Sequence, residues 1–298
     1  MIALACFGGV FLALWGATYA FYPTLVMGVR SAAGWLARRL RGHSRFGPLL
    51  GRLEPWRSYL PLVVALAVGT LIIVWTADAF IDIAIALKEH NPTVQRVDAV
   101  VQEWIGARRT PLTSAFFATI STVADPLGMS ALVVTVIAVL VARRRFRLGA
   151  YLAITAVGGA LLNQSLKLHY LRQRPDLKEA LLGATGYAFP SGHAMSGTVI
   201  LGALAYLASR STRSWRSTSA ALAALATTAL AIGISRIYLG VHWTSDVGAG
   251  FAAGLLWLAA TTMGYELFRQ YRLGQVDMAE RREAAASSAT QPPSPPDD

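Results

Sequence analysis

The chain has 298 residues, of which 54% are hydrophobic and only 14% are charged, whereas soluble domains carry roughly 25% charged residues. This composition favours a membrane protein over a soluble one. The formal net charge of +11 does not indicate nucleic-acid binding, because the arginines cluster between long apolar stretches instead of forming a basic stripe. The one cysteine, Cys6, excludes an intrachain disulfide.

Seven apolar stretches approach the roughly 20 residues that a helix needs to cross a bilayer. In chain order they are 2–29, 59–80, 126–142, 149–166, 194–209, 219–234 and 247–268. A break before the third is predicted by Asp125–Pro126, since Asp caps free helix amides and Pro suits the first helical position. The segments 93–106 and 111–123 are then expected as short outward-facing helices, with an interfacial position as one option.

The arginines predict the orientation of these helices. Four groups lie between or beside the apolar stretches: Arg30, Arg38, Arg39, Arg41, Arg45, Arg52 and Arg57; Arg143, Arg144, Arg145 and Arg147; Arg210, Arg213 and Arg216; Arg269, Arg272, Arg281 and Arg282. One topology, with the N-terminus outside, puts all four groups on the cytoplasmic side. The connections 81–125, 167–193 and 235–246 then face outward. The first stretch lacks a basic start and precedes its basic group, which favours a retained anchor over a signal peptide.

The predicted fold is therefore all-α and polytopic, with three regions. Residues 1–57 form an N-terminal membrane anchor and an Arg-rich cytoplasmic linker, and residues 58–270 form a six-helix membrane domain. Residues 271–298, which end in a Pro-rich run, are expected to be a disordered cytoplasmic tail.

Three polar motifs fall in the outward connections around the last four apolar stretches. They are Lys167 with Arg174–Pro175, then Pro190–Ser191–Gly192–His193, then Ser235–Arg236 with His242 and Asp246. Since the predicted topology puts all these connections on one side of the membrane, we expect the three motifs to meet there.

These residue types suit a tetrahedral dianion. Lys167, Arg174 and Arg236 supply three cations, and the planar fork of arginine matches phosphate oxygens. If the helix continues past Lys167, Arg174 shares its face two turns later. Ser191 and Gly192 begin a predicted helix, whose free amides and positive end attract anions.

Two histidines and a carboxylate supply the reactive groups. His242 and Asp246 are four residues apart, which predicts neighbours on one helical face. Asp246 can accept the Nδ1 proton of His242, which leaves Nε2 free to attack phosphorus. His193 remains as general acid for the leaving oxygen and as general base for water. This set suffices for two-step phosphoryl transfer through a phosphohistidine.

The pattern K-x6-RP, PSGH and SR-x5-H-x3-D resembles the signature of the type 2 phosphatidic acid phosphatase (PAP2) superfamily. Every signature position is present, between Lys167 and Asp246. The resemblance implies a six-helix catalytic core over 58–270, a histidine mechanism without metal or cofactor, and the roles given above. The N-terminal anchor and its linker lie outside the resemblance. No acidic cluster for magnesium and no nucleotide-binding Gly-rich loop accompany the motifs.

Each motif residue also has a structural interpretation. Lys167 and Arg174 are compatible with anchors at the membrane interface, Ser191 and Asp246 with helix caps, and the remaining residues with ordinary loops. Taken together, these interpretations would have to reproduce the spacing of a phosphotransfer site by chance. His169, Arg172 and Asp176, beside the first motif, either tune it or follow from interface chemistry alone.

The predicted function is hydrolysis of a lipid phosphate or diphosphate at the outer face of the cell membrane, with the bilayer and the lipid as partners. Undecaprenyl diphosphate is the first candidate, because an outward-facing site suits recycling of that carrier. Phosphatidate, diacylglycerol diphosphate and phosphatidylglycerol phosphate are the alternatives, as is phosphotransfer to another acceptor. A vanadium haloperoxidase and a non-enzymatic anion transporter or lipid-binding scaffold are more distant ones. The oligomeric state stays open.

Overall fold

The structure is a computed structural model that describes residues 9–10, 12–13, 16–17, 19–20, 60–175, 180–181, 183–211 and 214–290. Most of the predicted anchor at 2–29, the whole Arg-rich linker at 30–57, Asp176 and the Pro-rich end at 291–298 lie outside these residues.

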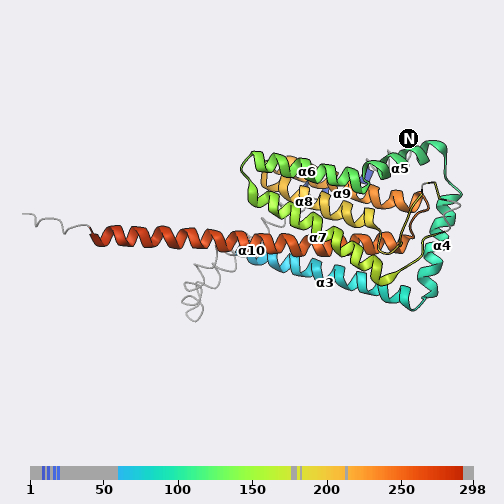
Figure 1. The fold of residues 1–298 in the computed structure, drawn as a ribbon, viewed down its shortest axis with the longest axis horizontal. Coiled ribbons are helices and arrows are strands. Elements are labelled where there is room, and N and C mark those ends of the chain that lie inside the picture. The colour runs from blue at the N-terminus through green and yellow to red at the C-terminus, as the bar shows by residue number, and fades with distance from the viewer. Residues whose placement is uncertain are drawn as a thin grey trace, which may run out of the picture.

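From residue 60 onward, every regular element that the structure describes is a helix. The helices are α3 (Leu60–Lys88), α4 (Pro92–Gly106), α5 (Pro111–Val123), α6 (Pro126–Ala142), α7 (Phe146–Tyr170), α8 (Gly192–Ser211), α9 (Trp215–Tyr238) and α10 (Thr244–Thr290). Helices α3 and α6 to α10 run side by side as a bundle, while α4 crosses one end of the bundle and α5 lies at that same end (Figure 1). The prediction of an all-α fold is confirmed.

The length and hydropathy of the helices make this a multi-span membrane protein. Four helices can cross a bilayer, over Leu62–Lys88, Phe146–Tyr170, Trp215–Tyr238 and Thr244–Val276. A fifth span arises if α5 and α6, which meet at a bend of 49°, are taken together. Helix α8 is not among these four and is strongly enclosed, with ten buried residues and with α7, α9 and α10 packed around it. Its Gly- and Ala-rich sequence suits a helix that faces protein rather than lipid.

The break between α5 and α6 lies where the sequence predicts it. Asp125 is the N-cap of α6 and accepts a hydrogen bond from the amide of Gly128 at 2.7 Å, and Pro126 occupies the first helical turn. Helix α6 has the predicted bounds, whereas the other helices of the bundle extend a few residues beyond their apolar stretches. The largest difference is in α10, which continues to Thr290 through residues that were expected to be disordered. Ala, Arg and Glu make up half of residues 271–290, and these are strong helix formers.

Close packing of α8 against α10 positions the start of α8. Gly250 and Gly254 of α10 face this contact: a Cβ at Gly250 would lie 2.7 Å from the carbonyl oxygen of Ser191, and a Cβ at Gly254 would lie 2.9 Å from Cβ of Thr198. The Ser191 amide also donates to the carbonyl oxygen of Asp246 at 2.9 Å. The second and third motifs are therefore held together by backbone contacts.

Candidate active site

The three motifs meet at the end of the bundle that α4 and α5 cover (Figure 1). The first motif comes from the last turn of α7 and the following loop, the second from the start of α8, and the third from the end of α9, its loop and the start of α10. Helices α7 and α9 run toward this end and α8 and α10 run away from it, so their connections come together there. The structure thus gathers residues that are up to 79 positions apart, from Lys167 to Asp246.

The centre of the site is the pair His242 and Asp246, which are 1% and 0% exposed. Nδ1 of His242 lies 3.4 Å from Oδ2 of Asp246, and the same oxygen accepts the amide of Trp243 at 2.9 Å. The two side chains are neighbours as predicted, but the prediction that they share one helical face is wrong, because α10 begins at Thr244 and His242 precedes it. The contact crosses the start of the helix, where the carboxylate also binds a free first-turn amide.

Arg174 determines the tautomer of His242. Its Nη1 lies 3.1 Å from Nε2 of the imidazole. A guanidinium only donates hydrogen bonds, so Nε2 is the acceptor and the ring proton is on Nδ1, facing Asp246. Burial lowers the pKa of His242 to about 4, although the hydrogen bond and the charge of Asp246 act in the opposite direction. His242 is therefore neutral at physiological pH, with its lone pair on Nε2.

The first motif supplies two cations, although not from one helical face. Helix α7 ends at Tyr170, and the next residue, Leu171, has a left-handed backbone conformation. Arg174 therefore lies on the loop after α7 and does not share a helical face with Lys167. Arg174 donates to the carbonyl oxygens of Val241 at 2.8 Å, Thr185 at 2.9 Å and Gly186 at 3.0 Å. Lys167 Nζ donates to the carbonyl oxygen of Tyr187 at 2.6 Å. Both cations thus hold backbone oxygens beside His242, and burial lowers the pKa of Arg174.

Among the motif residues, Ser191 Oγ and Arg236 Nε are buried and have no hydrogen-bond partner within the described part of the chain. Nη1 of Arg236 donates to Ser121 on α5. Buried donors are rarely left unpaired, so both atoms fit a site that takes an anion. Gly192 belongs to the same surface: a Cβ there would lie 3.1 Å from Oδ1 of Asn163 and 3.7 Å from Cε of Lys167, so a glycine lets α8 begin close to the first motif.

His193, in the first turn of α8, is the second titratable group. Burial lowers its pKa to about 3, and the charges of Arg236 and His242 add to this effect. The imidazole is therefore neutral, and a negative charge close to it would raise its pKa again.

The sequence does not predict that α4 contributes to the site. Gln102 donates to the carbonyl oxygen of His242 at 2.7 Å, and Asp98 accepts from Ser245 and from Arg172. Arg172, placed beside the first motif by the sequence, binds Asp246 at 2.5 Å. Asp98 and Gln102 are one helical turn apart, which is a weak signal of a polar face on α4. Their partners lie between 74 and 147 residues away, so no local pattern identifies them.

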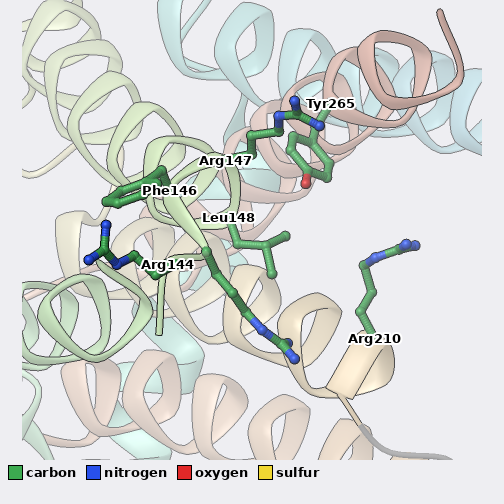
Figure 2. A pocket seen from close by; sticks show the side chains of 7 residues that line it. Arg144, Phe146, Arg147, Leu148, Arg210 and Tyr265 are labelled. Carbon is green, nitrogen blue, oxygen red and sulfur yellow. The ribbon is translucent and has the colours of Figure 1, made fainter. Parts of the chain in front are cut away.

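No group of three or more His, Cys, Asp or Glu side chains capable of holding a metal ion occurs within the part of the chain that the structure describes. A pocket of about 560 Å³ lies at the opposite end of the bundle, at the start of α7 and the end of α8. Figure 2 shows that the side chains of Arg144 and Arg210 in its lining do not converge on one point. This pocket contains none of the motif residues.

Residues 147–269 match the family model of the PAP2 superfamily. The matched region contains all three motifs, whereas α3 to α6 precede it.

Two relatives of the PAP2 region come from Bacillus subtilis. Phosphatidylglycerophosphatase B is 37% identical over 97 residues, which cover 32% of this chain and 47% of that protein, so the match spans about half of that relative's length. The crystal structure of a transmembrane PAP2-type phosphatidylglycerolphosphate phosphatase superimposes with a TM-score of 0.60 at 27% identity, over 65% of this chain and 95% of that chain. The structure of Aquifex aeolicus LpxE gives a TM-score of 0.44 at 23% identity over 55% of this chain and 94% of that chain.

Proposed function

We propose that the protein is a membrane phosphatase that hydrolyses a lipid phosphate or diphosphate through a phosphohistidine on His242. The observation that carries this proposal is the contact of Arg174 with Nε2 of His242 at 3.1 Å, opposite the contact of Nδ1 with Asp246. It combines a neutral, oriented nucleophile with a phosphate-binding cation at the attacking atom.

In the first step, Nε2 of His242 attacks phosphorus and the bond from phosphorus to the leaving oxygen breaks. His193 gives that oxygen a proton, so the leaving group departs as an alcohol or a lipid monophosphate. Asp246 stabilises the positive charge that forms on the imidazole of His242. Arg174, Arg236 and Lys167 neutralise the equatorial oxygens.

In the second step, water attacks the phosphohistidine while His193 takes a proton from it. The bond between phosphorus and Nε2 breaks, inorganic phosphate leaves, and His242 returns to its neutral form. His193 needs a proton for the first step, although its pKa is lowered to about 3. A phosphate dianion beside Arg236 offsets the positive charge that contributes to this lowering, so substrate and proton bind together.

Phosphatidylglycerol phosphate is the first substrate to test, because both Bacillus relatives are named for it. Undecaprenyl diphosphate, phosphatidate and diacylglycerol diphosphate present the same terminal phosphate chemistry. The cation in contact with His242, Arg174, suits the phosphate that all these lipids share. Discrimination among them therefore depends on contacts with the rest of the headgroup and with the tails. Transfer of the phosphoryl group to an acceptor other than water uses the same first step.

An outward-facing site in the cell membrane is supported by the distribution of arginines. Arg143, Arg144, Arg145 and Arg147 lie between α6 and α7, and Arg210 lies near the end of α8, at the end of the bundle opposite the motifs. Positive side chains concentrate on the cytoplasmic side of membrane proteins, which favours an outward position for the motifs.

The test is phosphate release by the detergent-purified protein in EDTA, with each of these lipids, for the wild type and for His242→Ala. The matched control is His90→Asn, because His90 is an exposed histidine in the left-handed region, which Asn tolerates. We expect release by the wild type and the control, and a loss of several orders of magnitude in His242→Ala. Equal release by His242→Ala would exclude it as the nucleophile. A folded wild-type protein that releases no phosphate, but labels an added acceptor, would indicate phosphotransfer.

A further inference from the structure

Asp98 of α4 is linked to the pair of His242 and Asp246 through Arg172, although it is outside the three motifs and the region matched to the family. It is 2% exposed and makes three hydrogen bonds. Its carboxylate accepts from the amide of Ser245 at 2.9 Å, from Oγ of Ser245 at 2.6 Å and from Nη2 of Arg172 at 2.9 Å. A buried carboxylate with three donors is fixed in one orientation.

Arg172 transmits this orientation to the active site. Its Nη1 donates to Oδ1 of Asp246 at 2.5 Å and to Oγ of Ser245 at 2.8 Å, while Nη2 binds Asp98. One guanidinium therefore joins the two carboxylates. Because the guanidinium is planar, fixing one edge on Asp98 also fixes the direction in which the other nitrogen points.

The two oxygens of Asp246 have separate partners. Oδ1 binds Arg172, whereas Oδ2 faces the Trp243 amide and Nδ1 of His242. Without a partner for Oδ1, the carboxylate could rotate toward other free amides in the first turn of α10, and Oδ2 would leave the imidazole. The contact with Arg172 thus holds Asp246 in the rotamer that serves His242.

We propose that Asp98 is a positioning residue for the nucleophile, acting through Arg172 and Asp246 on His242. This inference rests on the proposed function, because the relevance of His242 Nε2 depends on it. It makes α4, a helix that precedes the matched region, a part of the catalytic apparatus. Asp98 does not touch the substrate, so its effect falls on the reaction step and not on binding of the phosphate.

The first test compares steady-state kinetics of Asp98→Asn with those of the wild type. Loss of a residue that orients a functional histidine through its hydrogen-bond partners typically lowers activity by about 10- to 100-fold. We expect Asp98→Asn to lower kcat by this factor and to change KM by less than about two-fold. The matched control is Arg109→Ala, which removes a hydrogen bond from the loop between α4 and α5 to the carbonyl oxygen of Tyr238 but leaves the contacts of Asp98 intact. Losses of kcat in both variants that follow their unfolding temperatures would show a merely structural role and overturn the proposal.

A double-mutant cycle tests whether Asp98 acts through Asp246. If it does, Asp98→Asn combined with Asp246→Asn is no slower than Asp246→Asn alone, because the second change removes the group that the first one positions. Losses that multiply would show independent roles and contradict the proposal.

A spectroscopic measurement keeps this inference separate from the proposed activity. In ¹⁵N-histidine-labelled protein, the signal that disappears in His242→Ala reports the Nδ1 proton of His242. We expect Asp98→Asn to move this signal in the same direction as Asp246→Asn, and Arg109→Ala to leave it unchanged. An unmoved signal in Asp98→Asn would overturn the inference, whatever the activity. A moved signal in a protein without phosphatase activity would support the positioning contact and reject the proposed function.

Discussion

Arg174 donates a hydrogen bond to Nε2 of His242 over 3.1 Å, on the lone pair that attacks phosphorus in the proposed mechanism. Arg174 therefore has to exchange this contact for phosphate oxygens when substrate binds. The exchange is favourable because a charge-assisted bond from a guanidinium to phosphate is stronger than one to a neutral imidazole.

Replacement of Arg174 tests this exchange. We expect Arg174→Ala to lower kcat/KM by about 10²- to 10³-fold, as loss of one donor to a developing anion does. Arg174→Lys should recover only part of the activity, since an ammonium lacks the planar fork. Arg108→Ala, which removes an exposed arginine that lies over Trp104, is the matched control. Equal kcat/KM in Arg174→Ala and the wild type would remove Arg174 from the phosphate site.

His193 can be tested through the leaving group. As a general acid, it matters most when the leaving oxygen is a poor one, such as the alkoxide of a phosphate monoester. We expect His193→Ala to slow hydrolysis of phosphatidate more than hydrolysis of a lipid diphosphate, whose leaving group is already stabilised. Rates measured on the two lipids with one preparation give the ratio directly, and the same loss on both would contradict the assignment.

The lowered pKa values of the two histidines predict how stability depends on pH. Burial lowers the pKa of His242 to about 4 and that of His193 to about 3, whereas both titrate near 6.5 in an unfolded chain. Below pH ~6.5 the unfolded chain binds protons that the folded protein does not, so acid lowers the free energy of unfolding. The stability that the two neutral imidazoles contribute is complete above this pH and is lost progressively as the pH falls toward the folded-state pKa values. For each imidazole, the free energy of unfolding falls by at most about 1.4 kcal/mol per pH unit.

Unfolding temperatures in detergent between pH 4 and pH 8 check this dependence. The protonation of carboxylates contributes to the same profile, so the informative quantity is the difference between the wild type and His193→Gln. We expect a shallower decline toward acid in His193→Gln. Parallel profiles would mean that His193 is not buried in its neutral form.

Two glycines of α10 offer a test of the packing that positions the second motif. A Cβ at Gly250 would lie 2.7 Å from the carbonyl oxygen of Ser191 and 3.0 Å from Cβ of Ala194, whereas at Gly248 it would meet only Cδ1 of Ile83, at 3.6 Å. We expect Gly250→Ala to lower stability by about 1–3 kcal/mol, as overpacking does, and to lower activity by displacing Ser191.

Gly248→Ala is the matched control, since both glycines lie in the first two turns of the same helix. Alanine is the better helix former, so this variant should be as stable as the wild type or slightly more stable. The measurements are the unfolding temperatures and the rates of phosphate release of Gly250→Ala and Gly248→Ala, each compared with the wild type. If both glycines tolerate alanine equally, α8 does not approach α10 as closely as described.

The sequence predicts most of the helical framework because its signals are local. Apolar stretches locate the bundle helices, and Asp125 with Pro126 locates the start of α6 within a continuous apolar run. Residues 271–290 are helical and not disordered as predicted. The prediction gave more weight to the prolines and serines near the end of the chain than to the helix-forming residues before them. The sequence does not reveal where two helices stop near the site. Helix α7 ends at Tyr170, before Arg174, and α10 begins at Thr244, after His242.

The motif residues could be predicted as a group because their types and spacing are specific, and the structure brings them to one end of the bundle. Asp98 and Gln102 could not, since their partners Ser245 and His242 are 147 and 140 residues away. On α4 they resemble any polar residues of a helix at a surface. Arg172 has a weak local signal, two residues before Arg174, but interface chemistry accounts for that position equally well.

Helix α10 carries Asp246 in its first turn and continues for 47 residues, about 70 Å at about 1.5 Å per residue. A bilayer with its headgroups is only about 40–45 Å thick, so a helix that starts at one membrane surface is long enough to extend beyond the other by about a third of its length. The distal part of α10 projects from the bundle (Figure 1). The fold thus includes a helical spacer. A fluorophore or an affinity tag placed after Thr290 would be held clear of the lipid headgroups and far from the reacting atoms, so immobilised protein should remain open to its substrate.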